Sequence, residues 1–272
     1  MKRRLFIQTL ILSSGYILLS SKRLNGKYSD KDVIKILMIY NNIGESATLK
    51  KAWGLSVWIK KSNSALLFDT GGDTSIIWEN ISQLDLDLNK LSDIVISHNH
   101  WDHKNGLKII LEKTSNKPTV YVVENDFKEF SEKYPTANIK RVSGVMKIDS
   151  DIRTTGKLQA LYGGGELYEQ SLILTQNDSI VLLTGCSHPG IVNIVKKTKS
   201  LFPDKRVELV AGGFHLIQIS DSEIMKISNE LKELQVNKIA PSHCTGDNAI
   251  NIFKTEWGEK CINLNIGNEV TI

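Results

Sequence analysis

Cysteine is scarce in this sequence of 272 residues, which contains three: Cys186, Cys244 and Cys261. Three cysteines do not pair evenly, and their spacing is not that of a zinc ribbon. We therefore expect no disulfide framework.

A strong excess of one charge is also missing. The net charge is +4, with 24% charged and 41% hydrophobic residues, as in an ordinary soluble globular protein. Because no basic stripe with interleaved aromatic residues is present, we expect no nucleic-acid partner. The small-molecule substrate that we expect follows instead from the histidine cluster at 98–103. No linker, low-complexity tract or internal repeat interrupts the chain after residue 30. Residues 31–272 are therefore predicted to form one domain.

The N-terminal segment, residues 1–30, is predicted to lie outside the fold and to direct export. Lys2, Arg3 and Arg4 precede an uncharged, mostly apolar run of 16 residues, Leu5 to Ser20, which is short for a transmembrane helix. The Arg3-Arg4 pair resembles a twin-arginine signal. An ordinary Sec signal, or an uncleaved anchor that would attach the protein to a membrane, is the alternative, and a cytoplasmic location is the alternative to export.

From residue 32 onward, short β-rich runs alternate with stretches of helical spacing in both halves. This mixture predicts an α/β (α+β) sandwich, with two packed sheets and helices outside. The expected strands are 33–40, 54–60, 65–69, 93–97, 119–123, 171–175, 179–184, 207–211 and 238–241, with two short ones at the end. The expected helices are 74–84, 102–113, one from 126, 190–202, 222–234 and 247–257.

All six histidines lie at or just beyond the end of an expected strand, where α/β scaffolds place functional groups. Three occur in the run Ser97-His98-Asn99-His100-Trp101-Asp102-His103. Side chains two residues apart at an extended strand end point the same way, so His98 and His100 can hold one metal ion. The turn that follows can direct Asp102 and His103 toward a second ion. These ligands suit zinc, with manganese or iron as alternatives; a polar surface loop is the non-functional interpretation.

Asp69 follows an expected strand in Phe68-Asp69-Thr70-Gly71-Gly72. A buried carboxylate there can accept a hydrogen bond from a ligand imidazole and so fix its tautomer. The alternative is a turn residue that caps the next helix.

Residues from about 33 to 272 resemble the metallo-β-lactamase superfamily, and within it the dihydropterin–ribofuranosylaminobenzene-phosphate synthase-like branch. The segments that carry the closer match are GLS at 54–56, FDTG at 68–71, TGCSHPGIVN at 184–193, GGFHL at 212–216 and PSHCTG at 241–246. The resemblance implies a four-layer αββα sandwich with a metal centre in the cleft between its sheets. It implies that His98, His100 and His188 hold a first metal ion, and that Asp102, His103 and His243 hold a second. His188 and His243 could instead cap helices. His215 follows two glycines and is expected to contact substrate or move a proton rather than to bind metal.

One position departs from the pattern of many superfamily hydrolases, which have Gly-Asp where this sequence has Gly185-Cys186. That aspartate bridges the two metals, and no obvious acid replaces it, although Glu166 and Glu169 lie shortly before. Cys186 and Cys244 are each interpreted either as a soft extra ligand or as a small buried residue.

The sequence thus predicts a metal-dependent hydrolase that activates water against a phosphoryl or acyl ester-type bond, with Asp102 or His215 as the proton carrier. A transferase of the synthase-like branch is the first alternative, although an export signal argues against cytoplasmic pterin chemistry. A non-catalytic metal-binding sensor is the second. The loops 42–53 and 143–168, which would define the substrate, carry no recognisable motif.

Overall fold

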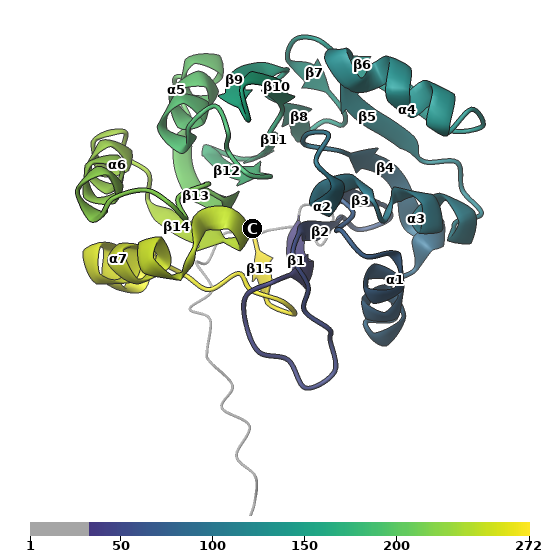
Figure 1. Ribbon diagram of the computed structural model, residues 1–272, viewed down its shortest axis with the longest axis horizontal. Helices are drawn as coiled ribbons and strands as arrows, with labels where there is room; N and C mark the ends of the chain where they lie inside the picture. Colours follow the sequence, from purple (N-terminus) through teal and green to yellow (C-terminus); the bar gives the residue numbers. More distant parts are fainter. Residues whose placement is uncertain (1–32) are drawn as a thin grey trace, which may run out of the picture.

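The computed structural model describes residues 33–272 (Figure 1). The expected export segment, residues 1–30, lies outside the described residues. Within residues 33–272, no helix combines the length and apolar character needed to cross a membrane.

Seven strands form the first sheet, and β-branched and leucine side chains fill both of its faces. Their order is β15 (Glu269–Thr271), β1 (Lys35–Asn41), β2 (Leu55–Lys60), β3 (Ala65–Phe68), β4 (Leu91–Val95), β5 (Thr119–Val123) and β6 (Asn138–Val142). The strands from β15 to β3 pair antiparallel, and those from β3 to β6 pair parallel. The carboxyl ends of β3 and β4 therefore meet at one edge, as expected for parallel neighbours.

Six strands form the second sheet. Their order is β14 (Lys238–Ser242), β13 (Arg206–Gly213), β12 (Ser179–Thr184), β11 (Leu172–Gln176), β8 (Ile152–Thr154) and β7 (Met146–Lys147). Since β12, β13 and β14 run parallel, their carboxyl ends also share one edge. A separate two-stranded hairpin, β9 (Leu158–Tyr162) and β10 (Gly165–Glu169), leads into β11.

Three apolar clusters hold four layers together. One joins the facing sides of the two sheets and includes Phe68, Val95 and Leu183. The others lie between each sheet and its outer helices. Figure 1 shows these helices on the outer sides of the two sheets. The helices on the first sheet are α1 (Thr74–Gln83), α3 (Leu107–Lys113) and α4 (Phe127–Lys133), with the single-turn α2 (Trp101–Lys104) at its edge; those on the second are α5 (Ile191–Leu201), α6 (Asp221–Glu233) and α7 (Asp247–Trp257). The predicted αββα sandwich is confirmed.

The prediction of a single helix at 102–113 was wrong. The segment forms two helices, α2 and α3, which are separated by Asn105 and Gly106. At Gly106 an added Cβ would lie 2.0 Å from the backbone oxygen of Thr70, so the chain passes too close for a side chain. The backbone N–H of Gly106 also donates to the carbonyl oxygen of Gly71. This contact fixes the turn that carries Asp102 and His103.

Two further segments differ from expectation. Residues 143–168, predicted to be loop, contain β7, β8, β9 and nearly all of β10. The chain end has one short strand, β15, in place of two, and Cys261 forms only an isolated bridge with Ile239. Strands of two to five residues give too little period-two alternation to be recognised in a sequence.

Candidate metal centre

The loops at the carboxyl ends of five strands converge on one point between the sheets. Residues 69 and 97–103 follow β3 and β4, and residues 186–188, 215 and 243 follow β12, β13 and β14. The shared edges of the parallel strands bring these loops together from both sheets. All six histidines are therefore at or beside one site.

His98, His100 and His188 form the first group of candidate ligands. Nε2 of His98 lies 3.0 Å from Nδ1 of His100, and one ligand atom from each residue lies within 4.8 Å of the others. Nε2 of His188 is buried and has no hydrogen-bond partner among the described residues. Zn–N bonds of about 2.0–2.1 Å place two tetrahedral ligands about 3.3 Å apart, so this spacing fits a metal ion.

Asp102, His103 and His243 form the second group. Oδ2 of Asp102 lies 3.3 Å from Nε2 of His243 and 3.7 Å from Nε2 of His103, and the two imidazole nitrogens are 3.2 Å apart. These ligand atoms also lie within 4.8 Å of one another. The two sets that the sequence predicted are each brought together.

Polar residues outside the two groups orient the imidazoles of the second group. Nδ1 of His103 lies 2.7 Å from Oδ2 of Asp69, and Nδ1 of His243 lies 2.8 Å from Oδ1 of Asn42. An acceptor on Nδ1 holds the proton there, so Nε2 keeps the lone pair that a metal needs. Asp69 thus lies where the sequence predicted, fully buried, whereas Asn42 was not predicted.

Asp69 is itself fixed by the loop that follows β4. The backbone N–H of Ser97 donates to Oδ1 of Asp69 over 2.6 Å, and the Ser97 hydroxyl donates to Oδ2 over 2.7 Å. Burial raises the pKa of Asp69, although these bonds and His103 oppose the shift. Burial would lower the pKa of His103, but the carboxylates of Asp69 and Asp102 outweigh it and raise that pKa to about 9. The carboxylates of Asp69 and Asp102 therefore favour positive charge at His103 itself, whereas burial and the neighbouring imidazoles lower the pKa of His98 and His100.

Glu169 was not predicted in its actual role. The sequence showed only that Glu166 and Glu169 lie shortly before Cys186; in the structure Glu169 lies behind His188, and Glu166 lies on the exposed hairpin. Oε1 of Glu169 accepts from the backbone N–H groups of Cys186 and Ser187, and Oε2 accepts from the backbone N–H of His188 and lies 2.9 Å from Nδ1 of the same residue. Burial raises the pKa of Glu169, but the bond to His188 and the backbone N–H groups lower it further than burial raises it. A glutamate directly before an apolar strand was the only signal in the sequence.

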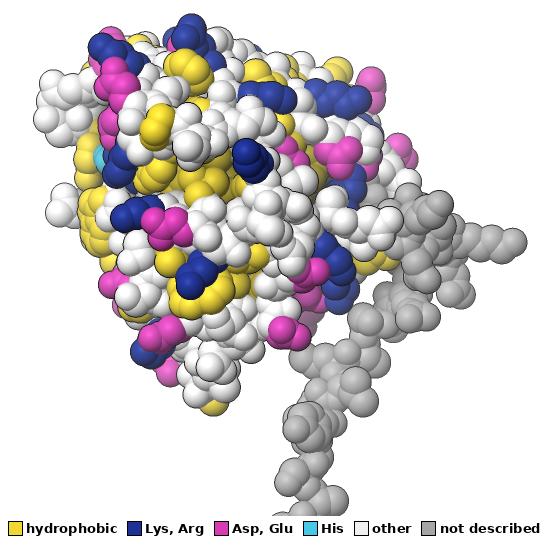
Figure 2. All heavy atoms as spheres, turned by 90° about the vertical axis from the view of Figure 1, so that its right-hand side faces the viewer, with side chains coloured by type: hydrophobic (Ala, Val, Ile, Leu, Met, Phe, Trp, Pro, Cys, Tyr) yellow, Lys and Arg dark blue, Asp and Glu magenta, His cyan; other side chains and the backbone are white. Residues whose placement is uncertain are grey.

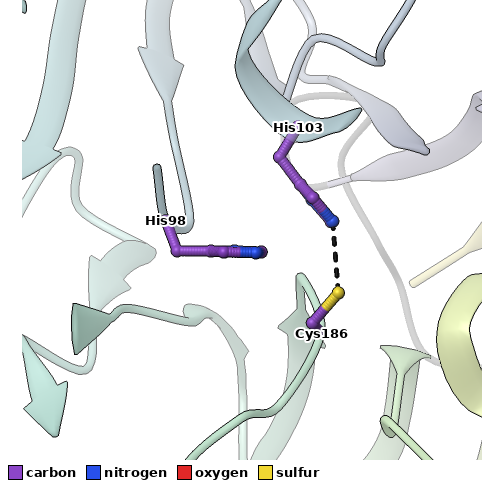
Figure 3. Close-up of side chains that lie close together, drawn as sticks. All are labelled: His98, His103 and Cys186. Carbon is purple, nitrogen blue, oxygen red and sulfur yellow. Dashed lines mark hydrogen bonds between the residues drawn. The ribbon is translucent and has the colours of Figure 1, made fainter. Parts of the chain in front are cut away.

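Cys186 lies between the two groups (Figure 3). In that view the rings of His98 and His103 point toward its sulfur, which lies 3.2 Å from Nε2 of His103. Its Sγ also lies within 4.8 Å of ligand atoms of His188 and of His243. The thiol therefore occupies the place expected for a bridging ligand. Cys244 is buried beside it, and its thiol donates to the Cys186 carbonyl oxygen at 3.6 Å.

His215 lies beside the two groups rather than within them. Its ring is 4.4 Å from that of His188, and its backbone has φ of +54°, a conformation that few residues other than glycine adopt. A hydrogen bond with Cys244 raises the pKa of His215, although burial opposes this. This position suits contact with substrate, as the sequence predicted.

A cavity of about 260 Å³ opens over this centre. Its lining residues are Trp53, His100, Trp101, Asp102, Tyr162, Cys186, His188, His215 and Cys244. Several candidate metal ligands thus form the floor of a hollow large enough for a small molecule.

Comparisons with known proteins bear on the family and the fold. A family model of the metallo-beta-lactamase superfamily matches residues 54–243. A 7,8-dihydropterin-6-methyl-4-(beta-D-ribofuranosyl)-aminobenzene-5'-phosphate synthase from Methanocaldococcus jannaschii is 28% identical, covering 87% of this chain and 96% of the relative. An uncharacterized protein of the same organism is 29% identical over 72% of this chain and 85% of its own length.

Solved structures show the same architecture. A protein described as a metal-dependent hydrolase of the beta-lactamase superfamily matches with a TM-score of 0.74 and 27% identity, covering 87% of this chain and 98% of its own. A diphosphatase of the PhnP family matches with a TM-score of 0.59 and 13% identity, over 88% of this chain and 97% of its own, which bears on the fold alone. By the family model, the αββα fold and the strand-end histidines, the chain belongs to the metallo-beta-lactamase superfamily.

Proposed function

We propose that the protein is a metal-dependent hydrolase that cleaves a phosphoryl or acyl ester-type bond in a small molecule. The observation that carries this proposal is the pair of ligand groups, His98/His100/His188 and Asp102/His103/His243, which reach an open cavity through His100, His188 and Asp102. Two ions, chiefly zinc, fit these donors; imidazole and carboxylate also bind manganese and iron. Bound metal would supply the acidity that lets water lose a proton near neutral pH.

The residues of the chain supply orientation and proton transfer. Asp69, Glu169 and Asn42 hold three ligand imidazoles through Nδ1, so that their Nε2 atoms face the centre. Asp102 borders the cavity. Burial raises the pKa of Asp102, but the interaction with His243 together with the charges of His103 and His243 lowers it further, so Asp102 is present as a carboxylate, the form proposed to accept a proton. His215 also borders the cavity and can donate a proton to the leaving group.

Cys186 is proposed to coordinate metal through sulfur in place of the missing aspartate. Its Sγ lies within reach of donor atoms from both ligand groups. A buried thiol at such a point loses its proton when a cation binds. The alternative is that Cys186 is only a small buried residue.

A transferase is the second candidate, and the likeness to the synthase favours it. The printed name of that relative specifies a 5'-phosphate. Among the described residues, the cavity lining contains no lysine or arginine that could pair with a phosphate away from the metal ions. We therefore place hydrolysis first. A non-catalytic sensor is the third candidate, and retention of both ligand groups argues against it.

The test is a turnover screen of the zinc-loaded protein with phosphodiesters, phosphomonoesters, thioesters, lactones and the pterin pyrophosphate plus ribosylaminobenzene phosphate pair. Hydrolysis that is lost on chelation and restored by zinc supports the proposal. Condensation of the pterin pair without hydrolysis would establish the transferase. No turnover of any class by protein carrying two metal ions would favour the sensor.

Export to the periplasm or cell envelope is proposed from Arg3, Arg4 and the apolar run that follows. The double replacement Arg3→Lys and Arg4→Lys keeps the charge and changes only the side-chain chemistry. Fractionation should show that the variant stays in the cytoplasm. Export that survives the change would leave a Sec signal or an anchor, and wild-type protein found only in the cytoplasm would exclude export.

A further inference from the structure

Aromatic side chains form the mouth of the cavity over the metal centre. Trp53, Trp101 and Tyr162 line it, and their exposed fractions are 41%, 54% and 47%. Large apolar side chains exposed together at a hollow mark a binding site more often than scattered ones do. Figure 2 shows one face of the molecule, on which hydrophobic side chains lie among acidic and basic ones.

Each aromatic ring is held in place by a specific local structure. The ring of Trp53 lies 4.9 Å from that of His243. Trp101 covers Gly72, where an added Cβ would lie 2.6 Å from the Trp101 ring and 2.9 Å from the backbone oxygen of Trp53. Only glycine at 72 leaves room for both tryptophan segments to approach, so their placement does not depend on chance surface packing.

Tyr162 reaches the site from the β9–β10 hairpin, which belongs to neither large sheet. Tyr162 pairs with Gly165, and the two intervening residues, Gly163 and Gly164, have φ of +60° and +82°. Positive φ at both central residues defines a type I′ turn, which these glycines adopt without strain. The turn places the Tyr162 ring 4.9 Å from that of His100 and 4.8 Å from that of His188.

Lysine and arginine are missing from the cavity lining within the described residues, where Asp102 is the only acid. Lysines of the loop 42–53 and of α2 pair with carboxylates outside the cavity lining. Lys50 pairs with Glu79, Lys51 with Glu45, and Lys104 with Glu129. A negative group of the substrate that lies away from the metal ions would therefore lose water without gaining a partner.

We infer that the cavity accepts substrates whose part remote from the reacting bond is uncharged and aromatic, packed against Trp53, Trp101 and Tyr162. For the reaction, this inference rests on the proposed function, but binding of the aromatic group does not depend on turnover. The volume of about 260 Å³ suits one small ring system rather than a polymer.

The test measures binding of 2-naphthol and of 6-hydroxy-2-naphthalenesulfonate to the zinc-loaded full-length protein by their own fluorescence. The sulfonate carries its charge at the far end of the same ring system. We expect 2-naphthol to bind at least about tenfold more tightly, because the sulfonate gains no lysine or arginine partner. Equal or tighter binding of the sulfonate, or no binding of 2-naphthol, would overturn the inference.

Variants show whether the rings themselves bind the probe. Trp53→Ala and Tyr162→Ala should each weaken 2-naphthol binding about three- to tenfold, the usual effect of losing an aromatic pair. Tyr162→Phe keeps the ring and should bind as the wild type does. Met225→Ala, an exposed apolar residue on α6, is the control and should have no effect. A loss in Tyr162→Phe as large as in Tyr162→Ala would assign binding to the hydroxyl and contradict stacking.

Turnover separates this inference from the proposed function. If the protein binds 2-naphthol as described yet hydrolyses no substrate class, the aromatic site is supported and the hydrolase proposal is refuted. If the protein hydrolyses esters but does not bind 2-naphthol, the hydrolase proposal is supported and the aromatic site is refuted.

Discussion

Replacing Glu169 with glutamine should weaken both the fold and the metal site. Each carboxylate oxygen of Glu169 serves two donors: Oε1 serves the N–H groups of Cys186 and Ser187, and Oε2 serves the N–H and the imidazole of His188. Glutamine has one carbonyl oxygen, so either orientation of its amide leaves two buried donors facing an NH₂ group.

The size of the effect follows from those two donors. An unsatisfied buried donor costs about 1–3 kcal/mol, so the free energy of unfolding should fall by about 2–6 kcal/mol. In the variant, Nδ1 of His188 no longer has a carboxylate as its acceptor, and the carboxylate is what fixes the tautomer of the ring. Zinc affinity should therefore fall about 10- to 100-fold. Ser187 at φ of +64° is held between these bonds, so the whole turn is affected.

Urea unfolding and competitive zinc titration measure the two effects. Glu166→Gln is the matched control, because Glu166 lies three residues earlier on the same hairpin, is exposed, and forms hydrogen bonds with the side chains of Gln159 and Tyr168. Its free energy of unfolding should change by less than about 0.5 kcal/mol. Wild-type stability and zinc affinity in Glu169→Gln, or equal losses in both variants, would refute this reasoning.

Three further predictions concern the metal ligands and one ion pair. His100→Ala should abolish metal-dependent turnover yet leave far-ultraviolet circular dichroism unchanged, because His100 lies in a strand-end loop; an unfolded variant would show that the metal is structural. Cys186→Asp should still bind two cobalt ions but lose the sulfur-to-cobalt charge-transfer absorption, and a band that persists would exclude Cys186 as a ligand. Lys61→Met should lower the free energy of unfolding by about 1 kcal/mol at pH 7, since Lys61 pairs with Asp149 and Asp151 across the edge between the sheets. Burial raises the pKa of both aspartates, but hydrogen bonds that include those of Lys61 lower it further, so the wild-type advantage in urea unfolding should shrink below about pH 4 as they gain protons; an advantage independent of pH would contradict the pairing.

The ligand groups could be predicted because local rules specify them. His98, His100, Asp102 and His103 lie within six residues at the end of one strand, so their convergence needs only the alternation of side chains and a turn. His188 and His243 required the family resemblance, since no spacing along the chain relates them to the first cluster. The structure then brought them together through parallel strands that end at one edge.

Residues that touch the site from distant segments could not be predicted. Asn42 lies 201 positions from its partner His243, and Glu169 lies 17–19 positions from its donors. Tyr162 belongs to a short hairpin whose alternation is too brief to indicate a strand. Such contacts depend on the packing of whole layers, which a local pattern does not encode.

The central claim is that two metal ions occupy two separate ligand groups. Anomalous diffraction at the zinc absorption edge, from crystals of protein purified without chelator, tests it most directly. We predict two peaks, one enclosed by His98, His100 and His188 and the other by Asp102, His103 and His243, with Cys186 near both. No peak in this cavity, or a single ion that the second group does not touch, would contradict the account.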